Sequence, residues 1–203
     1  MSVSVDYFDE LFAENDDPWA FRTRWYEQRK RDLTLAALPR QRYERVFEPG
    51  CANGELSLRL AHRCDEIVCM DMSTRAVELA RQRLAPFPRA TVHEGRLPED
   101  WPVGSFDLIV VSEWAYYLAP EQFARVIERL VASLTANGAV LACHWLHPIE
   151  GCPMVGREAH ALLDEQLKMH RTLRHEEKDF LLEMWSKQPG GIDLNEQVLD
   201  AAS

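Results

Sequence analysis

The sequence predicts an α/β fold in which a doubly wound, mostly parallel seven-stranded sheet ends in a C-terminal antiparallel hairpin. Two observations support this prediction. Short apolar runs alternate with amphipathic segments five times between residues 45 and 144, which is typical of parallel strands joined by helices. Two further β-type runs follow at 171–174 and 180–185, and the charged residues between them predict a hairpin.

The N-terminal segment is expected to be helical in two pieces over residues 6–38. Asp17 is suited to cap a helix that has Pro18 at its first position, and Pro39 should end the second piece. Further along, the run 106–112 is apolar without alternation, as expected for a central parallel strand covered on both faces. The five parallel strands are predicted at 45–49, 66–71, 90–94, 106–112 and 139–144.

Amphipathic segments with helical spacing connect and follow these strands. Ser73 is a suitable cap for the second of them, and Asn137 with Gly138 should end the third. At 203 residues the chain is most simply a single domain over 1–189, followed by a polar tail at 190–203. The predicted helices are 54–63, 74–84, 120–135 and 156–168.

The composition restricts the expected partners and compartment. A net charge of −10 argues against a nucleic-acid partner, which would need phosphate neutralisation. The five cysteines are odd in number and have no C-x-x-C spacing, so we expect reduced thiols in a cytoplasmic protein. No apolar run reaches 18 residues, and the polar, acidic start is unlike a signal peptide. We therefore expect no membrane span and no export signal.

A glycine turn after the first strand gives the clearest indication of a ligand. Three residues separate Gly50 from Gly54, and the middle glycine of a dinucleotide-binding turn is missing. The backbone can still approach a ligand closely, but the feature that holds a pyrophosphate is absent. Glu48 ends the first strand and Asp71 ends the second, where an acid accepts hydrogen bonds from ribose hydroxyls. This combination favours a nucleoside cofactor without pyrophosphate, which is S-adenosylmethionine.

Polar residues at other strand ends are expected to share the same cleft. Ligands of open parallel sheets bind outside the carboxyl ends of the strands, beside the first strand. Residues 94–97, Glu113 and His144 lie at the ends of the third, fourth and fifth strands. Glu48 is then well placed for the amino end of a methionine moiety. The alternative is that Glu48 and Asp71 are ordinary acids at strand ends.

Five motifs together resemble a known family over residues 6–189. The resemblance is to class I S-adenosylmethionine-dependent methyltransferases and, within them, to the nodulation protein S (NodS-like) group. It implies a Rossmann-like fold, S-adenosyl-L-methionine as cofactor with S-adenosyl-L-homocysteine as product, and N-methylation of an amino sugar. The motifs are Asp17-Pro18-Trp19, Trp25-Tyr26-Glu27-Gln28-Arg29-Lys30, Phe47-Glu48-Pro49-Gly50-Cys51, Ser112-Glu113-Trp114-Ala115-Tyr116-Tyr117-Leu118 and His144-Trp145-Leu146-His147-Pro148.

The resemblance also implies an N-terminal helical lid over 6–38 that covers the methionine end of the cofactor. In it, Arg29 would pair with the cofactor carboxylate, the alternative being a solvated basic face. Family members usually hold the adenine amino group with an Asp after the third strand, where this chain has Arg96, so backbone groups of Arg96 and Leu97 are the expected contacts. The predicted cofactor-binding residues are Tyr26, Arg29, Glu48, Gly50, Cys51, Gly54, Asp71, Met72, Arg96, Leu97 and Glu113.

Methyl transfer requires an aligned donor and acceptor, exclusion of water and, for nitrogen, a neutral amine. Deprotonating an aliphatic amine at pH 7 costs about 3–4 kcal/mol, which a base or desolvation can offset. The predicted catalytic residues are Glu113, Tyr117, His144 and His147. The alternatives are that Glu113 caps the next segment and that each histidine is a hydrogen-bonded core residue. No metal is expected, because His144 and His147 lack a third spaced ligand.

The sequence therefore predicts a methyltransferase that acts on a small molecule, with an amine as acceptor. Three alternatives stay open: an O-methyltransferase for a small metabolite, a nicotinamide-dependent oxidoreductase, and a non-catalytic module that keeps the cofactor fold. The oxidoreductase shares the sheet and the acid after the second strand, but the missing middle glycine argues against it. The sequence does not specify the acceptor or the oligomeric state.

Overall fold

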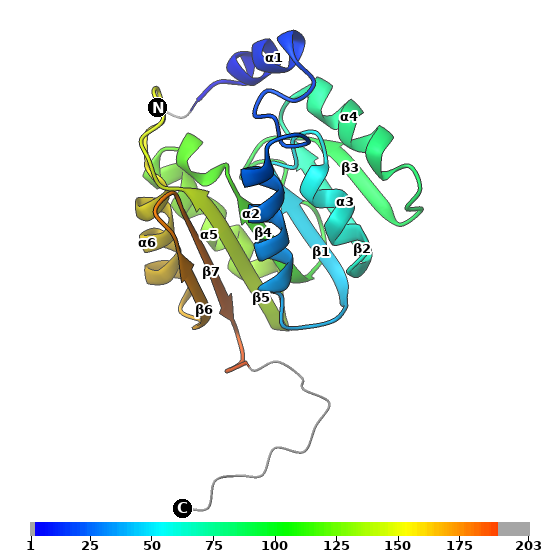
Figure 1. Ribbon diagram of the computed structural model, residues 1–203. Coiled ribbons are helices and arrows are strands. Elements are labelled where there is room, and N and C mark those ends of the chain that lie inside the picture. Colours follow the sequence, from blue (N-terminus) through cyan, green and yellow to red (C-terminus); the bar gives the residue numbers. More distant parts are fainter. Residues whose placement is uncertain (1–2, 191–203) are drawn as a thin grey trace, which may run out of the picture.

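The computed structural model describes residues 3–190, and its centre is a seven-stranded sheet with the order β3-β2-β1-β4-β5-β7-β6 (Figure 1). Neighbouring strands from β3 to β5 are parallel, whereas β7 pairs antiparallel with both β5 and β6. The predicted doubly wound sheet with a closing hairpin is confirmed. The strands are β1 (Tyr43–Pro49), β2 (Cys64–Asp71), β3 (Ala90–Glu94), β4 (Phe106–Ser112), β5 (Leu134–Trp145), β6 (His170–Glu176) and β7 (Phe180–Ser186).

Helices cover both faces of this sheet, and α1 lies beyond the carboxyl ends of the parallel strands, where it contacts α4 (Figure 1). In Figure 1, α2, α3 and α4 lie in front of the sheet, and α5 and α6 lie on the other side. The helices are α1 (Val5–Glu14), α2 (Trp25–Ala36), α3 (Glu55–Ala61), α4 (Thr74–Leu84), the 3-10 turn η1 (Ala115–Tyr117), α5 (Pro120–Ser133) and α6 (Gly156–Leu167).

The central strand β4 shows why its sequence is apolar throughout. Successive side chains of a strand point to opposite faces. Ile109 and Val111 belong to the core cluster that includes the apolar faces of α5 and α6, whereas Leu108 and Val110 belong to the cluster of α3 and α4. All four side chains are fully buried. A strand with helices on both faces has no polar side, so the predicted position of 106–112 is confirmed.

Two predicted helix boundaries are wrong. Asp17 does not begin a helix: its carboxylate accepts hydrogen bonds from the backbone N–H groups of Phe21 and Arg22 and holds a turn, and α2 begins only at Trp25. The third amphipathic helix ends at Ser133 rather than at Asn137 and Gly138. The latter two residues lie inside β5, where its register against β4 shifts.

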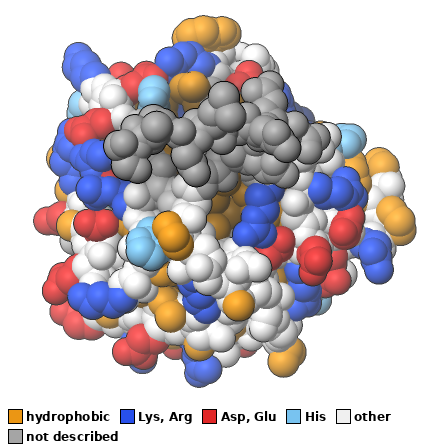
Figure 2. All heavy atoms as spheres, turned by 90° about the horizontal axis from the view of Figure 1, so that it is seen from below, with side chains coloured by type: hydrophobic (Ala, Val, Ile, Leu, Met, Phe, Trp, Pro, Cys, Tyr) orange, Lys and Arg blue, Asp and Glu red, His pale blue; other side chains and the backbone are white. Residues whose placement is uncertain are grey.

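The structure also describes the predicted cap at Ser73, the cysteines and the surface. Ser73 precedes α4, but its hydroxyl makes no capping hydrogen bond. All five cysteines are free thiols, and four of them are buried. Within residues 3–190, no helix combines the length and the apolar character that crossing a bilayer requires. The predicted polar tail lies outside the described residues except for Gly190. On the face seen in Figure 2, positive and negative side chains are interspersed around the described part of the surface.

Candidate functional site

A cleft of about 610 Å³ opens at the carboxyl ends of β1, β2 and β4, beneath α1. Its floor comes from the turn after β1, the end of β2 and the segment after β3. Its roof comes from the N-terminal residues 3–12, and Trp19 closes one side. The cleft therefore lies at the topological switch point beside β1, where open parallel sheets bind their ligands.

The turn at Gly50 is shaped by close contact with the wall of the cleft. Gly50 has φ of +68°, and a Cβ atom there would lie 2.7 Å from Cδ1 of Trp114. Gly54 has φ of +79° and packs against the backbone of Ala80 on α4, so a Cβ atom would lie 3.1 Å from its Cα. Both positions therefore need glycine, but only Gly50 lines the cleft.

Asp71 is held at the floor of the cleft by two backbone groups. The N–H of Ala52 donates to its Oδ2 at 2.9 Å, and the N–H of Ser73 donates to its Oδ1 at 3.0 Å. Each oxygen keeps a further lone pair for a ligand hydroxyl. Burial raises the pKa of Asp71 above its usual value, while these backbone hydrogen bonds act in the opposite direction. Met72, the next residue, also lines the cleft.

Glu48 and Cys51 lie beneath the turn and are not among the residues that line the cleft. Glu48 is 3% exposed, and the thiol of Cys69 donates to its Oε2 at 3.8 Å. Burial raises the pKa of Glu48 to about 8. The expected contact of Glu48 with the amino end of a methionine moiety is therefore not brought about by this geometry, because the carboxyl group points into the protein core.

The segment after β3 reaches the cleft through Gly95, Arg96 and Leu97. Its backbone is already partly engaged: the N–H of Arg96 donates to Asp100 at 2.8 Å, and the carbonyl of Leu97 accepts from Gln122 at 2.9 Å. A carbonyl oxygen has a second lone pair, so Leu97 retains an acceptor.

The predicted lid is divided between two roles. Val3–Phe12 and Trp19 cover the cleft, whereas Tyr26 and Arg29 on α2 do not line it. Arg29 forms a two-pronged ion pair with Glu177, with distances of 2.8 and 2.7 Å. The ring of Tyr26 packs edge-on against Trp145 and Phe180. These side chains join α2 to β7 and to the end of β5.

Glu113 is partly buried and is held in an ion-pair network with the buried Lys30 and Glu27 rather than in the cleft. Nζ of Lys30 lies 2.6 Å from one oxygen of Glu113 and 2.9 Å from Glu27. The other oxygen of Glu113 accepts from the hydroxyl of Tyr116 at 2.8 Å and from the N–H of Trp145 at 2.9 Å. Burial opposes the charge of Lys30, yet the neighbouring carboxylates hold its pKa above the usual value.

Of the four predicted catalytic residues, the structure brings Tyr117 alone to the wall of the cleft. His144 is completely buried, and its Nδ1 lies 3.1 Å from Nε2 of His160. His147 is near the surface, where its Nε2 lies 2.7 Å from Asp179. Among residues 3–190, no group of three or more His, Cys, Asp or Glu side chains is arranged to hold a metal ion.

Sequence reasoning missed several aromatic residues that line the cleft. They come from the N-terminal segment and from the residue after Glu113, and in the sequence they have the spacing of ordinary core residues. Trp19 and Trp114 each lie inside one of the motifs, and this was the available signal. The residues are Phe8, Phe12, Trp19 and Trp114.

The chain is similar to known proteins in both sequence and fold. The sequence model of Nodulation protein S (NodS) matches residues 8–147. Nodulation protein S of Sinorhizobium fredii is 30% identical over 131 residues, which cover 64% of this chain and 60% of the relative. A Magnesium-protoporphyrin O-methyltransferase of Rhodobacter capsulatus is 35% identical over 89 residues, 42% of this chain and 39% of the relative. The chain thus spans about three fifths or less of these two curated relatives.

Two solved structures extend the similarity over most of the chain. A candidate methyltransferase from Pseudomonas syringae is 57% identical, with a TM-score of 0.73, and the match covers 80% of this chain and 99% of that one. The N-methyltransferase NodS from Bradyrhizobium japonicum, solved with S-adenosyl-L-homocysteine, is 23% identical, with a TM-score of 0.81 over 90% of this chain and 97% of that one. At that identity the second structure supports the fold.

Proposed function

The chain belongs to the nodulation protein S (NodS) family, and we propose that it transfers the methyl group of S-adenosylmethionine to an amine of a small-molecule acceptor. The observation that carries the proposal is the fixed carboxylate of Asp71 at the floor of a cleft whose turn suits a nucleoside but lacks the glycine needed for a pyrophosphate. The nicotinamide-dependent alternative needs that glycine and is therefore not favoured.

The residues present fit the adenosine part of this cofactor. Asp71 would accept hydrogen bonds from the ribose hydroxyls, and Gly50 would leave room for the ligand against the main chain. Met72 and Leu97 would flank the adenine, with the carbonyl of Leu97 as an acceptor for its amino group. When bound, the cofactor supplies a methyl carbon that its sulfonium has already activated.

The remaining work of this chain is positioning and desolvation. The N-terminal segment closes the cleft through the hydrogen bond from the N–H of Val3 to the carbonyl of Tyr117, at 2.9 Å. Phe8 packs edge-on against the ring of Tyr117 with 4.9 Å between their centroids. Water exclusion by these rings would disfavour the charged form of an amine and so promote the neutral nucleophile.

Binding of S-adenosylhomocysteine, measured by isothermal titration, tests the cofactor assignment. Replacing Asp71 by Ala should weaken binding by about 1–3 kcal/mol, because a hydrogen-bonded charge is lost. Asp65→Ala is the matched control, since Asp65 lies at the other end of the same strand and pairs with Arg42. Equal affinity of Asp71→Ala and the parent protein would contradict the ribose assignment.

The acceptor is tested by transfer of a labelled methyl group to matched small amines and alcohols, amino sugars included. An O-methyltransferase is among the relatives, so the panel has to contain both nucleophiles. We expect methylated amines. Transfer to the alcohols alone would contradict the amine assignment while leaving the cofactor assignment intact.

A further inference from the structure

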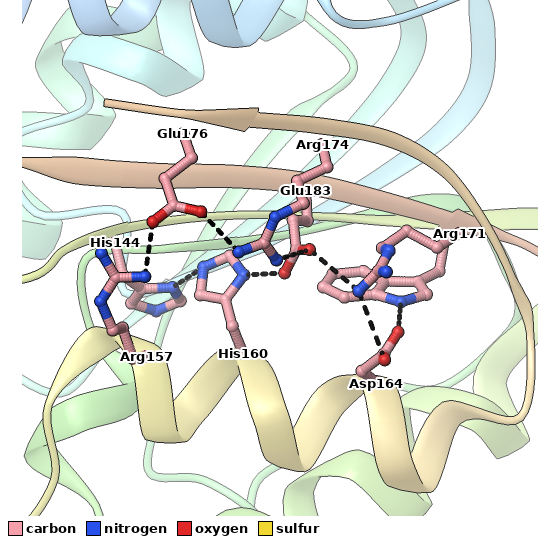
Figure 3. A network of polar contacts seen from close by, with 9 residues as sticks. His144, Arg157, His160, Asp164, Arg171, Arg174, Glu176 and Glu183 are labelled. Atoms are coloured by element: carbon pink, nitrogen blue, oxygen red, sulfur yellow. Dashed lines mark hydrogen bonds and ion pairs between the residues drawn. The ribbon is translucent and has the colours of Figure 1, made fainter. Parts of the chain in front are cut away.

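A chain of buried hydrogen bonds runs from the end of β5 through α6 to β7 (Figure 3). Nδ1 of His144 lies 3.1 Å from Nε2 of His160, and Nδ1 of His160 lies 2.7 Å from Oε2 of Glu183. The three side chains come from different elements, and their residues are 0%, 2% and 1% exposed. Ordinary core packing does not require three polar side chains in a row, so the order of donors and acceptors along the chain is informative.

With both rings neutral, the proton positions follow from the two ends of this hydrogen-bonded series, which are Glu183 and the backbone N–H of Ala115. The other oxygen of Glu183 is 2.5 Å from Arg174 and 3.2 Å from Arg171, which fixes Glu183 as a carboxylate (Figure 3). Burial opposes this charge, yet hydrogen bonds from His160 and Arg174 hold the pKa of Glu183 below its usual value. A carboxylate can only accept, so Nδ1 of His160 carries a proton, and in the neutral ring Nε2 of His160 is a bare acceptor.

The position of the proton on the His144 ring follows in the same way. Its Nδ1 must donate to His160, which leaves its Nε2 without a proton in the neutral ring. The backbone N–H of Ala115 points at that Nε2 from 3.4 Å. Burial and the neighbouring His160 lower the pKa of His144 well below its usual value, which keeps the ring neutral. The series of hydrogen bonds thus ends at Ala115, the first residue of η1.

The segment at η1 shapes the cleft from two sides. Trp114, just before Ala115, lies against Gly50 in the turn after β1. Tyr117, two residues after Ala115, holds the roof through the N–H of Val3 and the ring of Phe8. A shift at Ala115 would therefore move both the wall and the fastening of the roof.

We propose that His144, His160 and Glu183 are positioning residues, which fix a bare Nε2 on His144 and thereby hold the η1 segment in the shape that binds the cofactor. This inference rests on the proposed function, because it takes the cleft as the S-adenosylmethionine site. It replaces the expectation of His144 as a general base. Both ring nitrogens are engaged and the side chain is sealed from the cleft, and the amide of Ala115 cannot pass a proton onward.

The test compares three variants in binding to S-adenosylhomocysteine. His160→Leu removes both the acceptor for His144 and the donor for Glu183, and should weaken binding at least tenfold. His160→Gln retains one acceptor and one donor, so it should stay within threefold of the parent. Glu158→Leu is the matched control: on the same helix it removes the 2.9 Å hydrogen bond from the N–H of Val155, far from Glu183 and its arginines, and it should lower the melting temperature without changing affinity. Near-UV circular dichroism and thermal unfolding establish that each variant is folded.

A second measurement needs no variant. Nitrogen-15 spectra of the histidine rings in the parent protein should show a protonated Nδ1 and a bare Nε2 on both His144 and His160 at pH 7. A protonated Nε2 on His144 would overturn the inference, even if His160→Leu failed to fold. Unchanged affinity of a folded His160→Leu variant would overturn it as well. If the parent protein itself did not bind S-adenosylhomocysteine, the proposed function would fail. If the parent bound it and His160→Leu bound it equally well, only the inference about the histidines would fail.

Discussion

Glu48 gives a stability prediction whose size follows from its burial. The side chain lies at the end of β1 beneath the glycine turn and is 3% exposed. Its neighbours are the Cys69 thiol, at 3.8 Å, and the carboxylate of Asp71. Burial first, with the charge of Asp71 adding to it, raises the pKa of Glu48 from 4.5 to about 8. At neutral pH the folded protein therefore keeps this proton and the unfolded chain releases it.

This difference makes the protein less stable as the pH rises. Between pH 4.5 and about 8 the folded state binds one proton more than the unfolded state. The free energy of unfolding then falls by about 1.4 kcal/mol for each pH unit. The contribution of Glu48 is fully present below pH 4.5 and is lost as the pH approaches 8. At pH 7 the accumulated loss is about 3 kcal/mol, a large part of the stability of a typical domain.

Replacing Glu48 by Gln keeps the shape of the neutral acid and removes its titration. The variant should be about 3 kcal/mol more stable than the parent at pH 7 and equal to it near pH 4.5. Urea unfolding followed by tryptophan fluorescence at the two pH values measures both differences. Glu44→Gln is the control, because Glu44 is exposed on the same strand. An identical pH dependence of Glu48→Gln and the parent protein would refute the reasoning.

Two further predictions concern residues that shape the site. Replacing Lys30 by Met leaves the buried carboxylate of Glu27 and the partly buried carboxylate of Glu113 without their cation, so urea unfolding should show a loss of about 3–5 kcal/mol. Adding Glu113→Gln should restore part of this loss, and additive effects would contradict the direct pairing. Replacing Gly50 by Ala places a Cβ atom 2.7 Å from Trp114 at a positive φ, so titration should show S-adenosylhomocysteine binding weakened at least tenfold. Unchanged affinity would mean that the turn and Trp114 are free to move apart.

The sequence predicted most of the fold because hydrophobic periodicity reports burial directly. The run 106–112 had no polar face, and the structure covers β4 on both faces. Turn residues were less reliable guides. Asn137 and Gly138 have the local character of a helix end, but the pairing of β5 with β4 absorbs them as an irregularity within a strand. Tertiary pairing decided the structure at this point, and local preference alone could not reveal it.

Some residues of the cleft could likewise be predicted from the sequence and others could not. Asp71 and Gly50 line it as expected, since both positions follow from where a strand ends and a turn begins. The ion-pair partner of Arg29 could not be predicted, because Glu177 lies on the hairpin, far away in the sequence, and meets Arg29 only in the folded protein. Burial of Glu48 depends on how the turn packs above it. The aromatic roof was missed because its residues cannot be distinguished from core residues in the sequence.

The positions of the charged groups restrict how an amine acceptor can lose its proton. Glu113 is bound to Lys30, and His144 is sealed within its own hydrogen-bonded chain. Among the described residues that line the cleft, the carboxylates are those of Asp6, Asp71 and Glu99. Asp71 is engaged by the turn, and Asp6 and Glu99 are exposed to solvent at the rim rather than enclosed with the acceptor. Desolvation by the aromatic wall is therefore the main means of lowering the acceptor pKa. The pH at half-maximal rate should accordingly lie below the pKa of the free amine, and it should vary with the amine chosen rather than with a fixed side chain of the protein.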